Sequence, residues 1–275
     1  MIAERPAGDD ARIARAAPDP EALASGALFC EDAVIRRISR ENAVLMGGGC
    51  ALLLEVAHPL VAAGVARHSA FRTDPFGRLH RTLTAVSAIV FGTTEQALKA
   101  ANQVERAHRP VHGVLGAAAG RFAADARYAG ASPELICWVW ATLAWTTVRV
   151  HERLLDPIER TELDTFHREQ ACVARLLGVP TERAPANRGD FVAYFDRVRR
   201  DTLCVTEEGR TVASALFDSA LQGPMAGVPG AGLARALATS LLPEELRDPF
   251  GLEWSPASEE RLDQFADRLR AARRR

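Results

Sequence analysis

The chain has 275 residues, of which 48% are hydrophobic and 25% are charged, and its formal net charge is −1. This composition is typical of a globular protein and excludes wholesale disorder. The near-zero charge provides no general attraction to nucleic acid or to an anionic membrane, so we expect neither as a partner.

The cysteines and the N-terminus indicate the compartment. The five cysteines are widely spread, odd in number and without a C-x-x-C pair, which argues against a disulfide framework and a zinc ribbon. They are Cys30, Cys50, Cys137, Cys172 and Cys204. The first residues lack the basic and apolar regions of a signal peptide, and no uncharged apolar run reaches membrane-spanning length. We therefore expect a cytoplasmic protein with free thiols.

The first part of the chain predicts an arm followed by helices. Residues 1–26 are rich in Ala, Pro, Asp and Arg without an apolar face, which predicts a flexible arm before one domain over 27–275. Apolar residues from Val34 to Leu45 recur at helical spacing, and we expect Gly47-Gly48-Gly49 to break that run. These glycines precede a helix and could bind an anion, although close helix packing is the alternative that we favour. Pro59 is expected to start or kink the next helix.

The middle of the chain continues the helical pattern. Residues 74–77 have turn chemistry, and the apolar stripe that follows predicts a helix ending at Gly92. Thr93 with Gln96 predicts a capping box for a helix that runs to about Gly113. We expect residues 114–130 to form a long connection, and Ser132-Pro133 to open an apolar helix that stops near residue 156.

The remaining segments also favour helices. We expect them over residues 159–177, 188–203, 208–221, 231–242 and 256–272. No stretch alternates as a half-buried strand does, and hairpin dipeptides are missing. The sequence therefore predicts an all-α protein, a single compact bundle of roughly ten helices.

One expected helix places two arginines beside its apolar stripe. Arg78, Arg81 and Thr82 stand at positions i, i+3 and i+4, so they share a face. Guanidinium groups next to a core are costly unless an anion pairs with them, which makes the three residues candidates for a binding site. Arginines that extend into solvent are the structural alternative.

The next helix carries two histidines. His108 and His112 are expected to lie one turn apart, with Glu105 three residues before His108. Histidine is a common metal ligand, but a pair at this spacing is more often structural.

A second Glu-x-x-His pair, Glu55 with His58, raises the alternative of a di-iron centre. Two such pairs, together with one glutamate from each of two further helices, form the ligand set of di-iron carboxylate bundles. Glu152 and Glu169 are the candidates for those glutamates.

The order of these residues resembles a known family. The elements are Gly48-Gly49-Cys50 through Glu55-Val56-Ala57-His58-Pro59, then His68-Ser69, Asp74-Pro75, Arg78-x-x-Arg81-Thr82, Phe91-Gly92, His108-x-x-Val111-x-Gly113, Trp138-Val139-x-Ala141-Thr142-Leu143, Leu176 to Pro180, and Tyr194. Over residues 30–220 this order is similar to that of the rubber oxygenase (latex-clearing protein) and MpaB-type oxygenase family.

The resemblance implies a b-type haem inside the bundle. His108 matches the histidine that binds the haem iron, and His112 is the other candidate. In rubber oxygenase a lysine takes the place of Arg81 and can bind iron. Because arginine stays protonated, we expect Arg78 or Arg81 to pair instead with a haem propionate or a substrate anion, and Thr82 to hydrogen-bond bound dioxygen. Trp140 replaces a histidine that family members often have, which predicts a more apolar pocket.

These observations together predict a haem-dependent oxygenase that acts with dioxygen on an apolar or unsaturated small molecule. Glu55 and His58 are the expected proton-transfer groups. The alternatives are the di-iron oxidase and a non-catalytic protein that binds haem or another apolar ligand. The sequence predicts neither the substrate's identity nor the oligomeric state.

Overall fold

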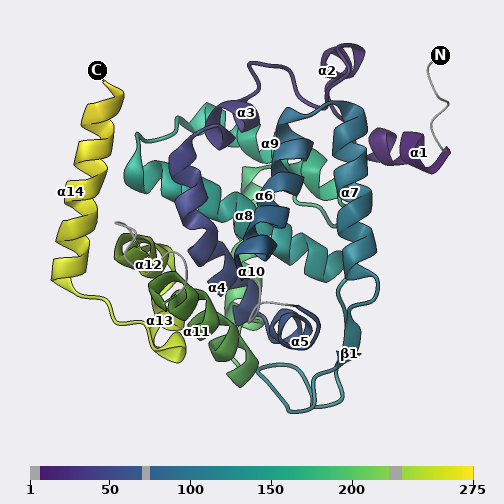
Figure 1. Ribbon diagram of the computed structural model, residues 1–275. Helices are drawn as coiled ribbons and strands as arrows, with labels where there is room; N and C mark the ends of the chain where they lie inside the picture. The colour runs from purple at the N-terminus through teal and green to yellow at the C-terminus, as the bar shows by residue number, and fades with distance from the viewer. Residues whose placement is uncertain (1–6, 70–74, 223–230, 275) are drawn as a thin grey trace.

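A computed structural model describes residues 7–69, 75–222 and 231–274 (Figure 1). These residues hold 14 α-helices, three of them with six residues or fewer, which confirms the all-α prediction. The N-terminal half contains α1 (Ala7–Ala16), α2 (Pro20–Ala24), α3 (Val34–Ser39), the 3₁₀ helix η1 (Asn42–Gly47), α4 (Gly48–Ala57), α5 (Pro59–His68), α6 (Pro75–Phe91), α7 (Thr94–His108) and the strands β1 (His112–Val114) and β2 (Arg127–Ala129). The C-terminal half contains α8 (Pro133–Leu154), α9 (Arg160–Leu176), α10 (Arg188–Asp201), α11 (Glu207–Gln222), α12 (Ala231–Leu241), α13 (Glu244–Arg247), the 3₁₀ helix η2 (Asp248–Phe250) and α14 (Pro256–Arg273).

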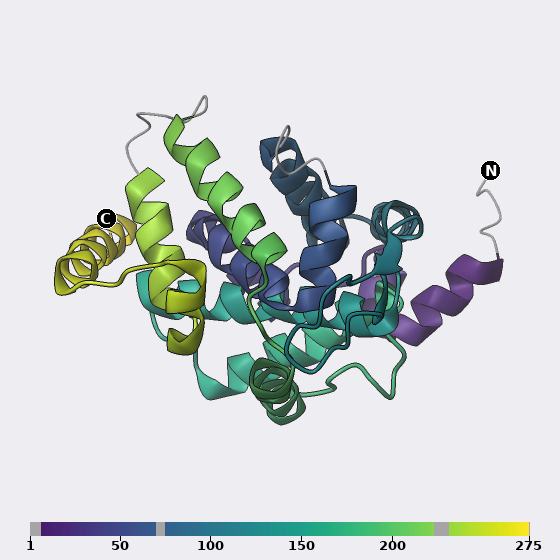
Figure 2. The ribbon, with the colours of Figure 1, turned by 90° about the horizontal axis from the view of Figure 1, so that it is seen from below.

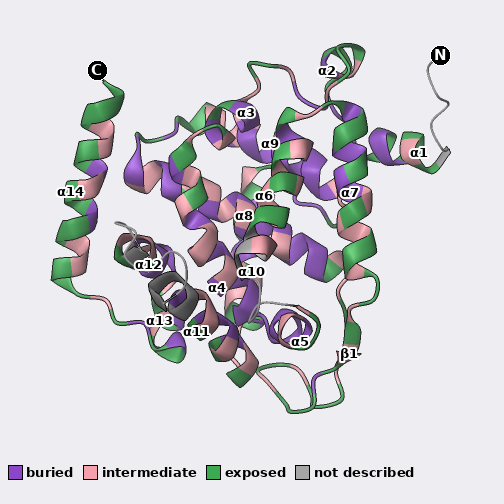
Figure 3. Cartoon of the chain, viewed as in Figure 1, coloured by how far each residue is buried: buried purple, intermediate pink, exposed green. Residues whose placement is uncertain are grey.

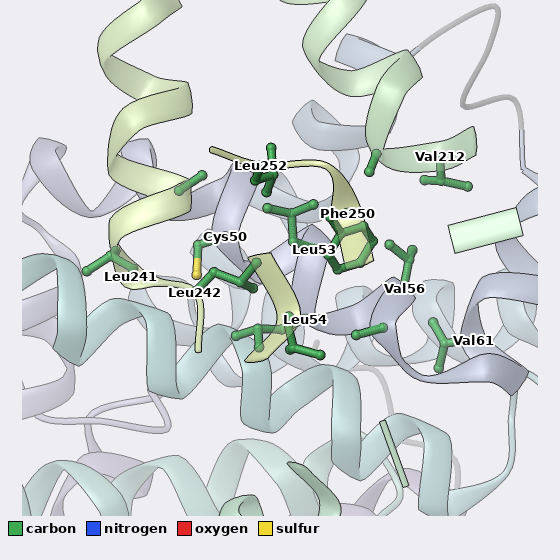
Figure 4. Packing of buried hydrophobic residues seen from close by; sticks show 14 of the residues in the cluster. Cys50, Leu53, Leu54, Val56, Val61, Val212, Leu241, Leu242, Phe250 and Leu252 are labelled. Carbon is green, nitrogen blue, oxygen red and sulfur yellow. The ribbon is translucent and has the colours of Figure 1, made fainter. Parts of the chain in front are cut away.

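Helix α4 is surrounded by other elements. Its sequence is apolar almost all round, and a helix of that kind is stable only when it is buried on most faces. Figure 2 shows α8, α9 and α10 on one side of it and α5, α6, α11 and α12 on the other. Cys50, Leu53 and Val56 pack into a cluster with Leu242 and Phe250 from the C-terminal part of the chain (Figure 4).

The core is divided into two clusters of buried apolar side chains. One centres on α4, α5, α11 and α12, and the other lies among α3, α7, α8 and α9. Trp145 and Tyr194 pack against both, so the clusters form one continuous packed domain. Figure 3 shows the buried residues on the inward faces of the helices, with α14 exposed along its outer side.

The helix starts follow the local sequence signals. Thr93 and Gln96 form the predicted capping box, and Pro59 and Pro133 occupy the first turns of α5 and α8. The five helices expected after residue 158 are present as α9, α10, α11, α12 and α14, within two residues of the expected bounds.

The glycine run does not interrupt a helix, contrary to the prediction. The break comes earlier, after α3 ends at Ser39, and η1 then leads directly into α4 across Gly47. A side chain at Gly47 would lie 2.6 Å from a methyl group of Thr146, and one at Gly49 would lie 3.2 Å from Ala238. These glycines allow α8 and α12 to approach α4 closely, which is the packing alternative rather than an anion site.

Helix α7 is shorter than predicted. It ends at His108 because Pro110, two residues later, has no N–H to continue the helical hydrogen bonds, although Arg109 between them is still in helical conformation. His112 consequently lies on strand β1, so the expectation that His108 and His112 are one helical turn apart is wrong. The predicted connection over 114–130 contains most of a small antiparallel hairpin, in which β1 pairs with β2.

Part of the expected N-terminal arm is packed against the domain. Ile13 and Ala16 of α1 are buried. The guanidinium of Arg12 donates to the carbonyl of Leu176 at 2.6 Å and forms a 3.0 Å ion pair with Glu105. Residues 7–26 thus form two short helices, and residues 1–6 lie outside the described part.

Candidate functional site

An apolar pocket runs along α4. It is lined by Ser39, Val44, Leu45, Gly47, Gly48, Gly49, Ala51, Leu52, Glu55, Thr82, Leu83, Val86, Ser87, Phe91, Leu143, Thr146, Thr147, Val212 and Leu216. Its empty volume is about 1340 Å³, counting the part that is open to solvent. Small-molecule sites typically have mostly apolar walls with a few polar groups, and this pocket has both features.

The pocket walls come mainly from α4, α6, α8 and α11, and residues of η1 and the end of α3 complete them. Figure 2 shows α6 and α11 on the same side of α4, and some of their residues are in contact. On α6 the lining residues Thr82 and Val86 are four positions apart, which places them on one face.

The pocket brings together two of the predicted site residues, Glu55 and Thr82. Glu55 is 7% exposed although it carries a carboxyl group, and Thr82 is half-buried. The C-terminal end of α6 is held by Arg36 of α3, which donates to the carbonyl of Val90 at 3.0 Å. This bond joins the C-terminal end of α6 to α3, and α3 is followed by η1, which ends at Gly47. Phe91 is therefore at the Gly47 end of the pocket, and Thr82 is nearer the Glu55 end.

The structure describes the side chain of Arg81 but not that of Arg78, the other arginine of the motif. Arg81 is exposed on α6 and does not line the pocket. Arg78 belongs to α6, but its side chain lies outside the described residues. The prediction that either one pairs with an anion stays a prediction.

His108 is half-buried at the C-terminal end of α7. It lies on the same face of α7 as the buried residues Ala97 and Ala101, because it follows them by about three and two helical turns. Its Nδ1 lies 2.7 Å from the carbonyl oxygen of Val104. When Nδ1 carries the proton and donates to that carbonyl, Nε2 keeps a lone pair, which is the arrangement of most metal-binding histidines.

His108 does not line the pocket as the structure stands. Helices α6 and α7 are antiparallel neighbours joined at Gly92 and Thr93, so the last turn of α7 lies level with the first turns of α6. His108 is therefore level with the first turn of α6, and Thr82 is near the middle of that helix. Figure 1 shows the two helices side by side.

The rest of the histidine motif has a structural explanation. Gly113 stands directly opposite Tyr128 in the β1–β2 pair, and a side chain on it would lie 2.6 Å from the Tyr128 hydroxyl. Val111 packs on Gly64 of α5, where an added side chain would be 3.3 Å from it. Val111 and Gly113 therefore fasten the hairpin to α5, whereas His112 is exposed beside them.

His58 is buried at the junction of α4 and α5. Its Nδ1 accepts a 3.3 Å hydrogen bond from the backbone N–H of Leu60, so the imidazole caps the N-terminus of α5. Burial lowers the pKa of His58 from 6.5 to about 4. The side chain is therefore neutral near pH 7, and it does not line the pocket.

The residues of the di-iron alternative serve other interactions. Glu105 pairs with Arg12 and Arg109, and Glu152 pairs with Arg149 near the surface. Glu169 accepts a hydrogen bond from the backbone N–H of Ile35 at 2.6 Å, and burial raises the pKa of its carboxyl group. Within the described ranges, no three His, Cys, Asp or Glu side chains gather as a metal site, so this ligand set is not assembled.

Trp140 lies in the second core cluster rather than in the pocket. Its indole N–H donates to Gln170 Oε1 at 3.0 Å, and its ring meets that of Phe191 edge-on. The prediction that this tryptophan makes the pocket more apolar is therefore wrong: the pocket's apolar walls come from other helices.

The structure also adds pocket residues that the sequence analysis did not identify. Thr146 and Thr147 of α8 and Ser87 of α6 place hydroxyl-bearing side chains on the walls. Their side chains are common in helices, so only the packing of α8 against α4 distinguishes them.

Comparison with known proteins identifies the family. Residues 35–271 match the catalytic domain described as "ER-bound oxygenase mpaB/B'/Rubber oxygenase", which covers most of the chain. The chain belongs to this oxygenase family. Comparisons with curated proteins and with solved structures gave no match.

Membership in the family makes the chain an oxygenase catalytic domain, and thus an enzyme domain. The pocket along α4 is the candidate active site. Among the described residues, no single helix has the length and hydropathy to cross a membrane, although η1 with α4 and α5 together pass that test as a pair bent by 107°.

Proposed function

We propose that this oxygenase uses haem b and dioxygen to oxidise an apolar or unsaturated small molecule bound along α4. The observation that carries the proposal is a pocket with mostly apolar walls that contains a buried carboxyl group, Glu55, and the hydroxyl group of Thr82. Apolar walls favour an apolar ligand, and the few polar groups orient it.

The donor groups are compatible with haem. His108 offers an imidazole whose Nδ1 is held by a backbone carbonyl, which leaves Nε2 for iron. It lies level with the first turn of α6, the helix that carries Thr82 near its middle. When bound, haem supplies an iron centre for chemistry with dioxygen, which protein side chains alone do not provide.

The chain's own residues would bind and orient the reactants. Leu52, Leu83 and Val86 exclude water from the apolar part of the substrate. Thr82 can hydrogen-bond an oxygen atom of a reactant, and Glu55 can accept or return a proton at the substrate. Arg78 and Arg81 are the proposed partners of an anionic group of the haem or the substrate. His58 supports the site through its cap on α5.

An absorbance spectrum of the purified protein tests the cofactor. We expect an intense band near roughly 400 nm, because haem bound through histidine absorbs there. Its absence, both in the protein as purified and after addition of hemin, would contradict the proposal. Haem that binds without oxygen-dependent turnover of any apolar substrate would instead indicate a non-catalytic binding protein.

His108→Ala tests the iron ligand. We expect the variant to keep its helical circular dichroism and to lose bound haem, because the only proposed protein ligand to the iron is removed. His112→Ala is the matched control, since that side chain is exposed on β1, and it should retain haem. Retention by His108→Ala together with loss by His112→Ala would move the ligand to His112.

A further inference from the structure

Two exposed apolar side chains line the pocket. Leu45 of η1 is 52% exposed and Phe91 of α6 is 37% exposed. In the described part of the chain, the other large apolar side chains of this exposure are Val114 (44%) and Val192 (46%), which do not line the pocket. Single exposed apolar residues are common on protein surfaces. Two that line the same cavity instead form an apolar surface that continues from solvent into its interior.

The exposure of the lining residues indicates which end of the pocket is open. Leu45 is two residues before Gly47, and Phe91 is at the same end of the pocket. Ser87, the third exposed lining residue, is about one helical turn before Phe91. The other described lining residues, including Glu55, are buried or half-buried. We therefore call the end with these three exposed residues the mouth of the pocket.

Helix α4 leads from the mouth to the buried carboxyl group. Gly48, Leu52 and Glu55 line the pocket from one face of this helix, because they are four and three positions apart. At 1.5 Å per residue, Gly48 and Glu55 are separated by about 10 Å along the helix. An extended alkyl chain advances roughly 1.25 Å per carbon, since a C–C bond is about 1.5 Å long, so about eight carbons cover this length.

We propose that an apolar substrate enters at the mouth, and that Leu45 and Phe91 hold the tail of a long chain whose functional group lies beside Glu55. The two side chains are then specificity-determining residues, because a chain too short to reach the mouth gains nothing from them. Their contact with a longer chain removes apolar surface of both partners from water, which favours binding. This inference rests on the proposed function for the use of the pocket by the substrate, but it does not depend on haem.

Leu45→Ser and Phe91→Ser test the inference, because serine removes the apolar contact at an exposed position. Val114→Ser and Val192→Ser are the matched controls, since these two valines are similarly exposed and lie outside the pocket. Each purified protein is titrated with 1-hexanol and with 1-dodecanol by isothermal titration calorimetry. By the length given above, the six-carbon chain ends before the mouth and the twelve-carbon chain reaches it.

The expected result depends on chain length. In Leu45→Ser and in Phe91→Ser the affinity for 1-dodecanol should fall by about 3- to 10-fold, which corresponds to the loss of one or two buried methylene groups, and the affinity for 1-hexanol should stay the same. The control variants should bind both alcohols as the starting protein does. Leu45→Met and Phe91→Leu, which keep an apolar side chain, should retain the affinity for 1-dodecanol.

Equal losses for the two alcohols would overturn the inference, and so would an equal loss of 1-dodecanol affinity in the control variants. Absence of 1-dodecanol binding to the starting protein would also overturn it. A length-dependent loss in a protein that binds no haem would support the inference and contradict the cofactor proposal, so the two failures are distinguishable. Thermal unfolding checks that the variants fold; because both residues are exposed, we expect the melting temperature to change by less than about 2 °C.

Discussion

Two buried histidines, His58 and His167, are held in their neutral form. Burial lowers the pKa of each from 6.5 to about 4. His167 is 5% exposed between Phe166 and Phe191, and its Nδ1 has no hydrogen-bond partner. Both side chains therefore resist protonation as long as the protein is folded.

This gives a prediction for stability against pH. As pH falls from about 6.5 to about 4, the unfolded chain takes up protons at these histidines before the folded protein does, so the free energy of unfolding falls. The loss is up to about 3 kcal/mol for each histidine, and it is absent above pH 6.5. Urea unfolding at a series of pH values measures it.

His58→Asn separates the contribution of one histidine, because asparagine also caps helices but does not titrate. We expect a shallower loss of stability toward pH 4 in this variant, and an unaltered profile in the exposed control His112→Asn. A His58→Asn profile identical to that of the starting protein would contradict the assignment.

At the residue scale the sequence predicted part of the site. Glu55 and Thr82 were identified from motif and spacing, and both line the pocket. Leu45 and Phe91 were not predicted to be pocket residues, because their place at its mouth depends on how η1 and α6 lie around α4. Contacts of this kind are set by tertiary distances, which local spacing does not contain.

At the scale of elements, the hairpin after α7 is held to α5 by close packing. Gly113 lies under the ring of Tyr128, and the Tyr128 hydroxyl is 3.3 Å from His68 Nε2 at the end of α5. Arg67 of α5 also donates to the carbonyl of Leu115 at 2.7 Å. The hairpin follows His108 directly and fixes the path of the chain after it.

Gly113→Ala should disturb this packing. The new methyl group would lie 2.6 Å from the Tyr128 hydroxyl, and overpacking of this kind typically costs about 1–3 kcal/mol. Chemical denaturation measures the change. Gly232→Ala in α12 is the control, because nothing lies within 4 Å of the added group, and we expect it to be neutral or slightly stabilising. Equal stability of the two variants would show that the contact is not tight.

Element boundaries were predictable where the signal is local. Thr93 with Gln96 and Ser132 with Pro133 mark helix starts through contacts within one turn, and both starts are correct. The hairpin was missed because its strands have three residues each and are separated by a long connection without a turn dipeptide. The glycines of Gly47–Gly49 were taken as a break because their packing partners lie about 100 and 190 residues further along the chain.

At the scale of the whole molecule, the C-terminal helix α14 packs against α8 and is hydrogen-bonded to its C-terminal end. Leu262 and Ala266 are fully buried in the first core cluster. Arg270 donates to the carbonyls of Leu155 and Arg153, at 2.6 and 3.1 Å, where α8 ends and its carbonyls have no helical partners. The cationic side chain also suits the negative end of the helix dipole.

Arg270→Gln should weaken this attachment. Loss of two charge-assisted hydrogen bonds, in a partly exposed position, is expected to cost about 1–2 kcal/mol and to lower the melting temperature by a few degrees. Arg268→Gln is the control, since Arg268 is exposed on the other side of the same helix and should leave the melting temperature unchanged. A Tm shift of equal size in the control would attribute the effect to net charge rather than to the contacts of α8.

The Arg12 contacts connect the beginning of the polypeptide to the proposed ligand histidine. The guanidinium reaches Asn102 and Glu105 on α7, and Glu105 is one turn before His108. Proteolytic trimming of the first sixteen residues would therefore remove a support from the helix that presents the imidazole, some ninety positions away in sequence. We expect an enzyme shortened in this way to keep its pocket and to hold the proposed haem less firmly.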